Sequence, residues 1–205
     1  MESPLHTIYI SFPPEVTQQV KTIYDAIVTA CDNTNSFPVD WVPHIDVFTA
    51  RVKPEDSSEY VELFNSLNMK SFKNTICLEK LEISDNGKFI FITPNEESKA
   101  YIYKLRTYLE MQLGKYKDLT LTEFFKSHWD TYTKDQQERI LKTGGYYEYN
   151  PHFTVIKLSP DESRKAFEIA KKYFKPIMFE VGLKLTAQNL SNEYLFETKA
   201  IKEFI

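Results

Sequence analysis

WVPHIDVFT at residues 41–49 and YNPHFTVIK at residues 149–157 are two copies of one motif in this 205-residue chain. In each copy an aromatic residue stands three positions before a histidine, and a proline stands directly before the histidine. The apolar and β-branched residues that follow favour a strand. The sequence therefore predicts two histidine-bearing strands in equivalent settings.

Side chains alternate between the two faces of a strand. His44 therefore shares a face with Asp46, and His152 shares a face with Thr154. An imidazole titrates near neutral pH, so a pair of them can hold one neutral and one protonated ring at the same time. Two such rings, each beside an oxygen-bearing side chain, indicate an acid–base pair.

The surroundings of the two copies repeat as well. Each histidine strand is followed by a helix that opens near a proline, at Pro54 or Pro160, and then by further strands, expected at 75–83 in the first half and at 177–187 in the second. Asn86-Gly87 marks a hairpin turn. We interpret the pattern as an imperfect duplication. It predicts an α+β fold that is bilobal, with two pseudo-symmetric lobes of antiparallel sheet, helices packed outside and a central groove.

We expect residues 1–205 to form a single bilobal domain with an insertion at about 114–150, a segment that has no counterpart in the first half. Its helical parts are expected at 120–127 and at 133–141, the second capped by Thr133 and Gln136. It ends in a glycine pair, which favours a lid or a specificity loop.

Composition narrows the classes of partner. The net charge is −4 and no basic footprint is evident, so we expect no binding of a long nucleic-acid duplex. No apolar run is long enough to span a membrane, and the first residues do not resemble a signal peptide. The 2 cysteines fit no metal or disulfide spacing. These features predict a cytoplasmic monomer, in the cytosol of a host cell if the source is a pathogen, that needs no metal or cofactor and acts on a nucleotide or short RNA.

The two histidine motifs carry a resemblance to a known family. The sequence resembles the 2H phosphoesterase superfamily, the 2'-5' RNA ligase and 2',3'-cyclic phosphodiesterase-like proteins, which share two His-x-Thr/Ser motifs in a bilobal α+β fold. His152-Phe153-Thr154-Val155 matches this motif fully, whereas His44-Ile45-Asp46-Val47 departs from it. The resemblance implies metal-free phosphodiester chemistry. One histidine would be the general base and the other the general acid, and the Thr154 hydroxyl would bind the phosphate. Which histidine is the base stays open.

Asp46 replaces the expected hydroxyl with a carboxylate, which only accepts hydrogen bonds. Three interpretations follow. Asp46 holds His44 and raises its pKa, which makes His44 the acid. Alternatively, it reads a donor on the substrate, such as a ribose hydroxyl. In the third interpretation, the site is degraded and only binds. We favour the first two, because the residues that flank His44 keep the motif's pattern.

Aromatic residues near the motifs are candidates for binding a base. Trp41 and Tyr149 stand at matching positions, and Tyr147 follows the glycine pair; all three are predicted to stack on a base, with core packing an equal alternative for the first two. A regular strand places Lys157 on the face opposite His152, so Lys157 and Arg51 are interpreted as solvated charges, and His6 and His128 as peripheral groups.

The sequence therefore predicts a phosphodiesterase that hydrolyses 2',3'-cyclic or 2'-5' phosphodiester bonds of nucleotides or short RNA. His44 and His152 would be catalytic, and Thr154, Asp46, Trp41, Tyr149 and Tyr147 would bind the substrate. One alternative is a catalytically silent RNA- or nucleotide-binding module of the same fold. Another is an interaction protein whose working surface is the 114–150 segment.

Overall fold

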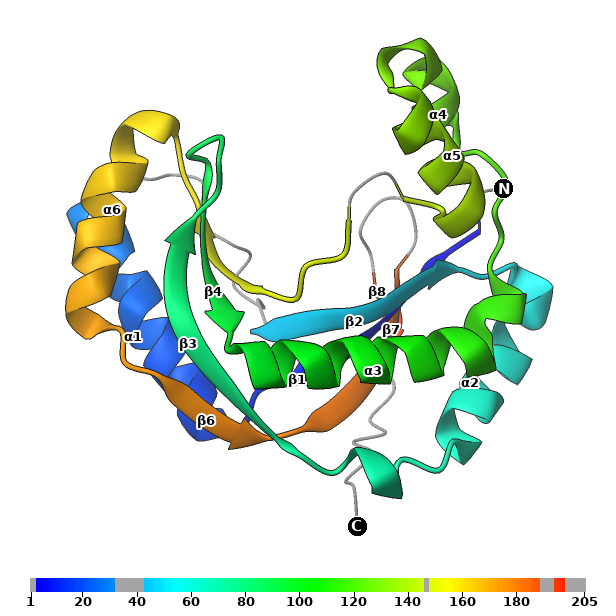
Figure 1. Ribbon diagram of the computed structural model, residues 1–205, viewed down its shortest axis with the longest axis horizontal. Helices are drawn as coiled ribbons and strands as arrows, with labels where there is room; N and C mark the ends of the chain where they lie inside the picture. Colours follow the sequence, from blue (N-terminus) through cyan, green and yellow to red (C-terminus); the bar gives the residue numbers. More distant parts are fainter. Residues whose placement is uncertain (1–2, 32–42, 146–147, 189–193, 198–205) are drawn as a thin grey trace.

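The computed structural model describes residues 3–31, 43–145, 148–188 and 194–197 (Figure 1). Its helices and strands, in chain order, are β1 (Leu5–Ser11), α1 (Pro14–Ala30), β2 (His44–Arg51), α2 (Ser57–Ser66), β3 (Thr75–Ile83), β4 (Phe89–Pro94), α3 (Glu96–Leu113), α4 (Glu123–Ser127), α5 (Lys134–Thr143), β5 (Phe153–Lys157), α6 (Pro160–Tyr173), β6 (Ile177–Glu180), β7 (Gly182–Gln188) and β8 (Tyr194–Glu197).

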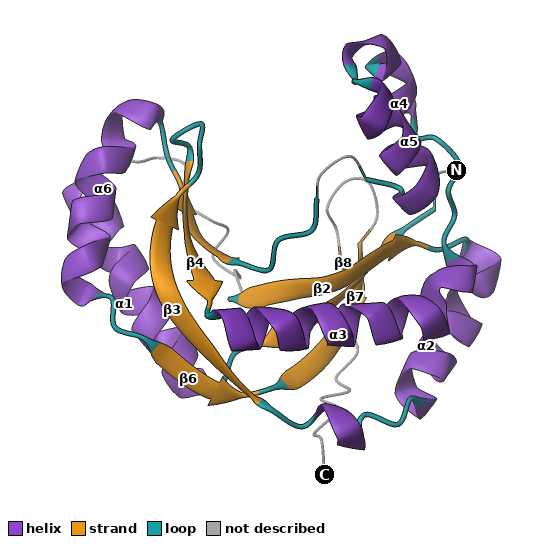
Figure 2. Cartoon of the chain, in the orientation of Figure 1, coloured by secondary structure: helices purple, strands orange, loops and turns teal. Residues whose placement is uncertain are grey.

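Within the described residues the strands form two antiparallel sheets of four strands each (Figure 2). The first has the order β2-β1-β7-β8 and the second the order β5-β4-β3-β6. Strand β2, which begins at His44, and strand β5, which begins directly after His152, therefore each lie at an edge of a different sheet. The predicted α+β class with two antiparallel sheets is confirmed.

The two halves of the sequence exchange strands. The single strand predicted at 177–187 is wrong: the chain leaves the second sheet at Glu180 and joins the first at Gly182, so the segment forms β6 and β7. In contrast, the hairpin predicted at Asn86-Gly87 is present between β3 and β4, with Gly87 at a φ of +68°, where a glycine is favoured. Each sheet thus combines strands from both halves of the chain.

Helices and buried aromatics hold the sheets together. Helices α1 and α6 pack on each other and against the second sheet, and α3 lies along β2 and reaches β3 and β4 (Figure 1). Phe12, just beyond β1, packs its ring 5.1 Å from that of Phe153 and 5.0 Å from that of Phe179. These ring contacts join the first sheet to β5 and β6 through one core. No helix among the described residues has the length and apolar character that a membrane crossing requires.

A β-bulge interrupts β2 directly after its functional pair. Asp46 lies opposite Tyr9 of β1, but the next paired residue, Phe48, lies opposite Ile8, so Val47 is an extra residue in the strand. A bulge of this kind shifts the alternation of side chains by one position. Val47 and Phe48 are both buried, and Thr49 returns to the face that carries His44.

The same bulge recurs in β5, three residues after its histidine. Thr154 lies opposite Phe91 and Ile156 lies opposite Ile90, which leaves Val155 as the extra residue. Lys157 therefore lies on the same side of the strand as His152, and the prediction that it points away is wrong. Because the two bulges occupy equivalent positions, they support a pseudo-symmetric relation between the two histidine strands.

Helices α4 and α5 project from the body of the protein as an arm (Figures 1 and 2). The predicted capping box of α5 is confirmed, with the Thr133 hydroxyl and the Gln136 side chain each accepting from the other residue's backbone N–H. At the base of the arm the backbone N–H of Asp118 donates to the carbonyl of Arg51 at 2.8 Å. The guanidinium of Arg51 donates to the Thr120 carbonyl, so Arg51 anchors the arm and is not merely a solvated charge.

His6 is wholly buried in β1, which lies between β2 and β7, so its interpretation as a peripheral group is wrong. Its Nδ1 lies 3.3 Å from the Pro4 carbonyl, which can only accept, and its Nε2 lies 3.0 Å from the Ser57 hydroxyl. The ring therefore fits its site in the neutral form. Burial lowers the pKa of His6 below its ordinary value of 6.5.

Acid should destabilise the fold through His6. Its stabilising contribution is complete above pH 6.5 and is lost as the pH falls toward the lower pKa of the folded state, because the unfolded chain takes up the proton first. The free energy of unfolding can be measured by urea denaturation at two pH values, about one unit above and about one unit below 6.5. We expect the decrease from the higher to the lower pH to be smaller in His6→Gln than in the wild type.

The exposed His128 supplies the control. His128→Gln should keep the wild-type dependence of stability on pH. Equal pH dependence in His6→Gln and the wild type would contradict the assignment of the acid sensitivity to His6.

Candidate active site

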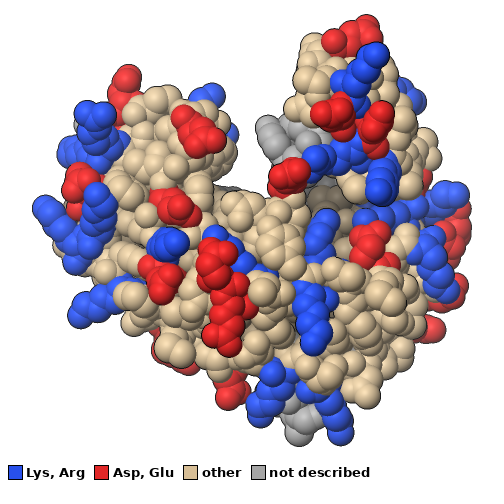
Figure 3. All heavy atoms as spheres, in the orientation of Figure 1, with Lys and Arg blue, Asp and Glu red and all other residues tan. Residues whose placement is uncertain are grey.

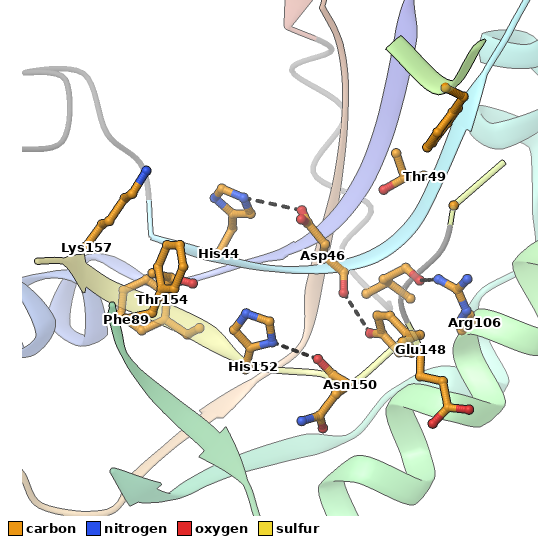
Figure 4. Close-up of a pocket in the computed structure, with 15 residues that line it drawn as sticks. His44, Asp46, Thr49, Phe89, Arg106, Glu148, Asn150, His152, Thr154 and Lys157 are labelled. Carbon is orange, nitrogen blue, oxygen red and sulfur yellow. Dashed lines mark hydrogen bonds and ion pairs between the residues drawn. The ribbon is translucent and has the colours of Figure 1, made fainter. Parts of the chain in front are cut away.

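Both motif histidines line one cavity of about 710 Å³. It lies where the molecule is hollowed between the α4–α5 arm and the lobe that carries α6 (Figure 3). His44 reaches it from β2 and His152 from the residue before β5 (Figure 4). Asp46 and Thr154 also line it. The two pairs predicted from the sequence, His44 with Asp46 and His152 with Thr154, therefore lie in one cavity.

The orientation of His152 is fixed by its own backbone. Its Nδ1 lies 2.8 Å from the carbonyl oxygen of Asn150 (Figure 4). Its ring centroid lies 5.3 Å from that of Phe91. A carbonyl only accepts hydrogen bonds, so Nδ1 carries a proton. In the neutral ring this leaves Nε2 as the nitrogen with the lone pair.

His44 has a different partner. Its Nε2 lies 3.3 Å from Oδ1 of Asp46, and its ring centroid lies 4.9 Å from that of Tyr9. The side chains of His44 and Asp46 are 36% and 57% exposed, so water reaches the pair from the cavity. A carboxylate favours the protonated, positively charged form of a neighbouring imidazole. The two rings are therefore held in unlike electrostatic surroundings.

Two side chains satisfy the carbonyl groups at the β2 bulge. The Tyr149 hydroxyl donates to the backbone carbonyl of Asp46 at 2.7 Å. The Arg106 guanidinium donates from Nη1 to the carbonyl of Val47 at 2.9 Å, and its Cζ lies 4.2 Å from the centre of the Tyr149 ring. Since Tyr149 precedes β5, this group ties the first histidine strand to the segment that carries His152. We call Tyr149 and Arg106 the clasp.

Of the three aromatic residues predicted to stack on a base, the structure describes Tyr149. Tyr149 lines the cavity, but its ring is stacked under Arg106, and the Tyr103 hydroxyl donates to its backbone carbonyl at 2.9 Å. Burial raises the pKa of the Tyr149 hydroxyl well above its ordinary 10.0, so the hydroxyl stays protonated and donates. Stacking of a base on this ring stays a prediction. Trp41 and Tyr147 lie outside the described residues.

The structure adds cavity residues that the sequence did not single out. Lys157 and Arg106 supply positive charge, and Glu148 adds a second carboxylate to the lining besides that of Asp46. Lys157 Nζ lies 5.8 Å from the centre of the Phe89 ring, which is also part of the wall. Lys157 could be found from the sequence only by a reader who knew of the bulge. No pattern in the sequence points to Arg106, because its partner is the backbone carbonyl of Val47, which the bulge leaves without a partner in the sheet. Across the described chain, no group of three or more His, Cys, Asp or Glu side chains is arranged to hold a metal ion.

Comparison with known proteins gives a consistent result for the fold. No protein-family model and no curated protein matches the sequence. Among solved structures, E. coli LigT complexed with 3'-AMP is 11% identical with a TM-score of 0.57, over 97% of this chain and 97% of LigT. LigT complexed with ATP gives the same identity and TM-score, over 97% of this chain and 96% of LigT. TT0787 of Thermus thermophilus is 14% identical with a TM-score of 0.51, over 96% of each chain.

LigT and TT0787 are 2H phosphoesterase superfamily proteins, so the resemblance stated from the sequence is confirmed at the level of the fold. The bilobal α+β arrangement with two antiparallel sheets is that of LigT. At such low identity the likeness concerns the fold, and the roles of individual residues rest on the geometry described above.

The clasp should contribute to stability. Tyr149→Phe removes the hydroxyl that donates to the Asp46 carbonyl, and we expect it to lower the free energy of unfolding by about 1 kcal/mol, the usual net worth of one hydrogen bond. Urea denaturation measures the change. Tyr173→Phe removes the hydroxyl of an exposed tyrosine on α6 and should have little effect. Equal stabilities of the two variants would contradict the clasp.

Proposed function

We propose that this chain is a phosphodiesterase that hydrolyses 2',3'-cyclic or 2'-5' phosphodiester bonds of nucleotides or short RNA without a metal ion. The observation that carries the proposal is that two imidazoles, one on β2 of the first sheet and one directly before β5 of the second, line one cavity of about 710 Å³. Ligand cavities for small molecules usually measure roughly 300–1,000 Å³. The structures of LigT with ATP and 3'-AMP support a nucleotide as the ligand of this fold.

We assign the general base to His152. Its Nδ1–H is held by the Asn150 carbonyl, which directs the lone pair of the neutral ring to Nε2. In hydrolysis of a cyclic phosphate, Nε2 removes a proton from water as the water oxygen bonds to phosphorus. The backbone partner keeps the ring in this tautomer, so no side chain is needed to orient it.

We assign the general acid to His44. The Asp46 carboxylate, 3.3 Å from Nε2, stabilises the imidazolium form of the ring. As the bond between phosphorus and the leaving oxygen breaks, His44 gives that oxygen a proton. One proton enters at His152 and one leaves from His44, so the reaction is balanced. Asp46 thereby has a use in the site, and the departure from the His-x-Thr pattern sets the roles of the two histidines.

The other lobe supplies groups that suit a phosphate. Thr154 lies beside His152 and its hydroxyl can donate to a phosphoryl oxygen, where negative charge builds up during the reaction. Lys157 adds a positive charge on the same side of β5, which offsets the negative charge of Asp46 across the cavity. The substrate phosphate is therefore expected nearer to β5 than to β2.

A silent nucleotide-binding module of the same fold is the second candidate. The observation that favours it is Asp46, whose carboxylate repels a phosphate and stands where the other motif has a hydroxyl. For either function we propose a cytoplasmic monomer. The low number of cysteines, 2 in 205 residues, supports a reducing compartment.

Removal of either histidine decides between the two candidates. With EDTA present, we expect the wild type to hydrolyse a nucleoside 2',3'-cyclic phosphate, and His152→Ala or His44→Ala to lower kcat by about 10²- to 10⁴-fold, the usual worth of general acid–base catalysis. The exposed His128 lies outside the cavity, so His128→Ala should keep the wild-type rate. Nucleotide binding without turnover in the wild type would support the silent module instead.

The roles of the two rings can be tested at Asp46. Asp46→Asn removes the charge that stabilises the His44 imidazolium, so the fall of kcat/KM at high pH should move to lower pH. The pH–rate profile measures this shift. A strong gain of activity in Asp46→Thr would show instead that Asp46 had degraded the site.

A further inference from the structure

A second cavity adjoins the first. It measures about 480 Å³, and it meets the main cavity at Arg106 and Tyr149, which line both. Its outer wall is the α5 face of the arm. The remaining lining residues all come from that helix: Asp135, Glu138, Arg139, Lys142 and Thr143. A ligand that continues beyond the main cavity at the clasp would therefore enter this space.

Positive groups from two helices converge on the second cavity. Arg106 comes from α3, and Arg139 and Lys142 come from α5. Arg139 donates from Nη2 to Glu148 at 2.9 Å, and the Glu148 side chain is 82% exposed. An ion pair with one partner this exposed contributes little to stability, so a ligand phosphate can compete with Glu148 for Arg139.

The cavity also carries acceptors, so it is not a simple anion site. Asp135 and Glu138 lie on the same helix and line the same space. Carboxylates accept hydrogen bonds from hydroxyl and amino groups. Basic groups for a phosphate together with acceptors for a ribose hydroxyl or a base amine are the pair of features that a nucleotide requires.

We propose that the second cavity is a subsite for a further nucleotide of the substrate, with its phosphate at Arg139 and Lys142. The inference rests on the proposed function and makes it more specific: the preferred substrate is an oligonucleotide of two or more units, which lies across the clasp with its reacting phosphodiester between the histidines. A mononucleotide fills only the main cavity. The arm is then part of the binding surface, and its α5 face determines the length of the substrate.

The test compares substrates of different length. The two probes are a nucleoside 2',3'-cyclic phosphate and a trinucleotide that ends in a 2',3'-cyclic phosphate. We expect the wild type to prefer the trinucleotide through a lower KM. Lys142→Gln should reduce the ratio of the two kcat/KM values by about two- to fivefold, the range of an exposed ion pair. For the trinucleotide, the slope of log kcat/KM against log salt concentration should be less steep in Lys142→Gln than in the wild type by about 0.7, the value of one phosphate contact on a single strand.

A matched control is available on the same arm. Lys126 is exposed on α4 and lines neither cavity, so Lys126→Gln should keep the wild-type ratio and salt slope. Arg139→Gln repeats the test on the second basic residue of α5. Thermal unfolding followed by circular dichroism shows whether each variant is folded. Equal ratios in the wild type, Lys142→Gln, Arg139→Gln and Lys126→Gln would overturn the subsite.

Failure of the proposed function gives a separate result. If neither probe is hydrolysed, fluorescence anisotropy with a labelled trinucleotide 3'-phosphate measures binding directly. Weaker binding in Lys142→Gln than in Lys126→Gln would then support the subsite, although the phosphodiesterase is rejected. Binding of equal strength in both variants and in the wild type would overturn the subsite as well.

Discussion

The backbone carbonyls at the bulge of β2 are the groups on which the site depends. A bulge on an edge strand leaves carbonyls without a partner in the sheet, and a polar group left unpaired in a partly buried place costs about 1–3 kcal/mol. Tyr149 and Arg106 satisfy the carbonyls of Asp46 and Val47. Because these donors come from the segment before β5 and from α3, one local requirement of β2 is met by two distant parts of the chain. The first histidine is thereby held in a fixed relation to the second.

The equivalent bulges give the two strands the same backbone geometry, but the side chains at equivalent positions differ in charge. In both copies, the side chains two and five residues after the histidine reach the cavity. In β2 these are Asp46 and Thr49, whereas in β5 they are Thr154 and Lys157. The first lobe is thus acidic next to its histidine and the second is basic. This difference in charge, placed on a common geometry, is what suits two identical side chains to opposite roles in proton transfer.

The arrangement of the strands explains why the cavity lies between the lobes. The chain builds β3 and β4 into the second sheet before β5 joins them, and then returns through β7 to the first sheet beside β1. Each histidine strand is left at an edge, where it can face the other. If each duplicated unit formed its own sheet, the chain would not cross from the second sheet to the first at Val181. The exchange also makes each lobe depend on both halves of the sequence, so separated halves would lack complete sheets.

The local parts of this structure could be predicted from residue order alone. The repeated motif specified two strands with His44 beside Asp46 and His152 beside Thr154, and turn and cap residues such as Gly87 and Thr133 specified where elements end and begin. Alternation along a strand and capping at a helix end are interactions between near neighbours, which is why they are visible in the sequence. The face of Lys157, the partner of Arg106 and the burial of His6 became clear only in the folded chain, because each depends on strand pairing or on contacts between residues far apart in the sequence.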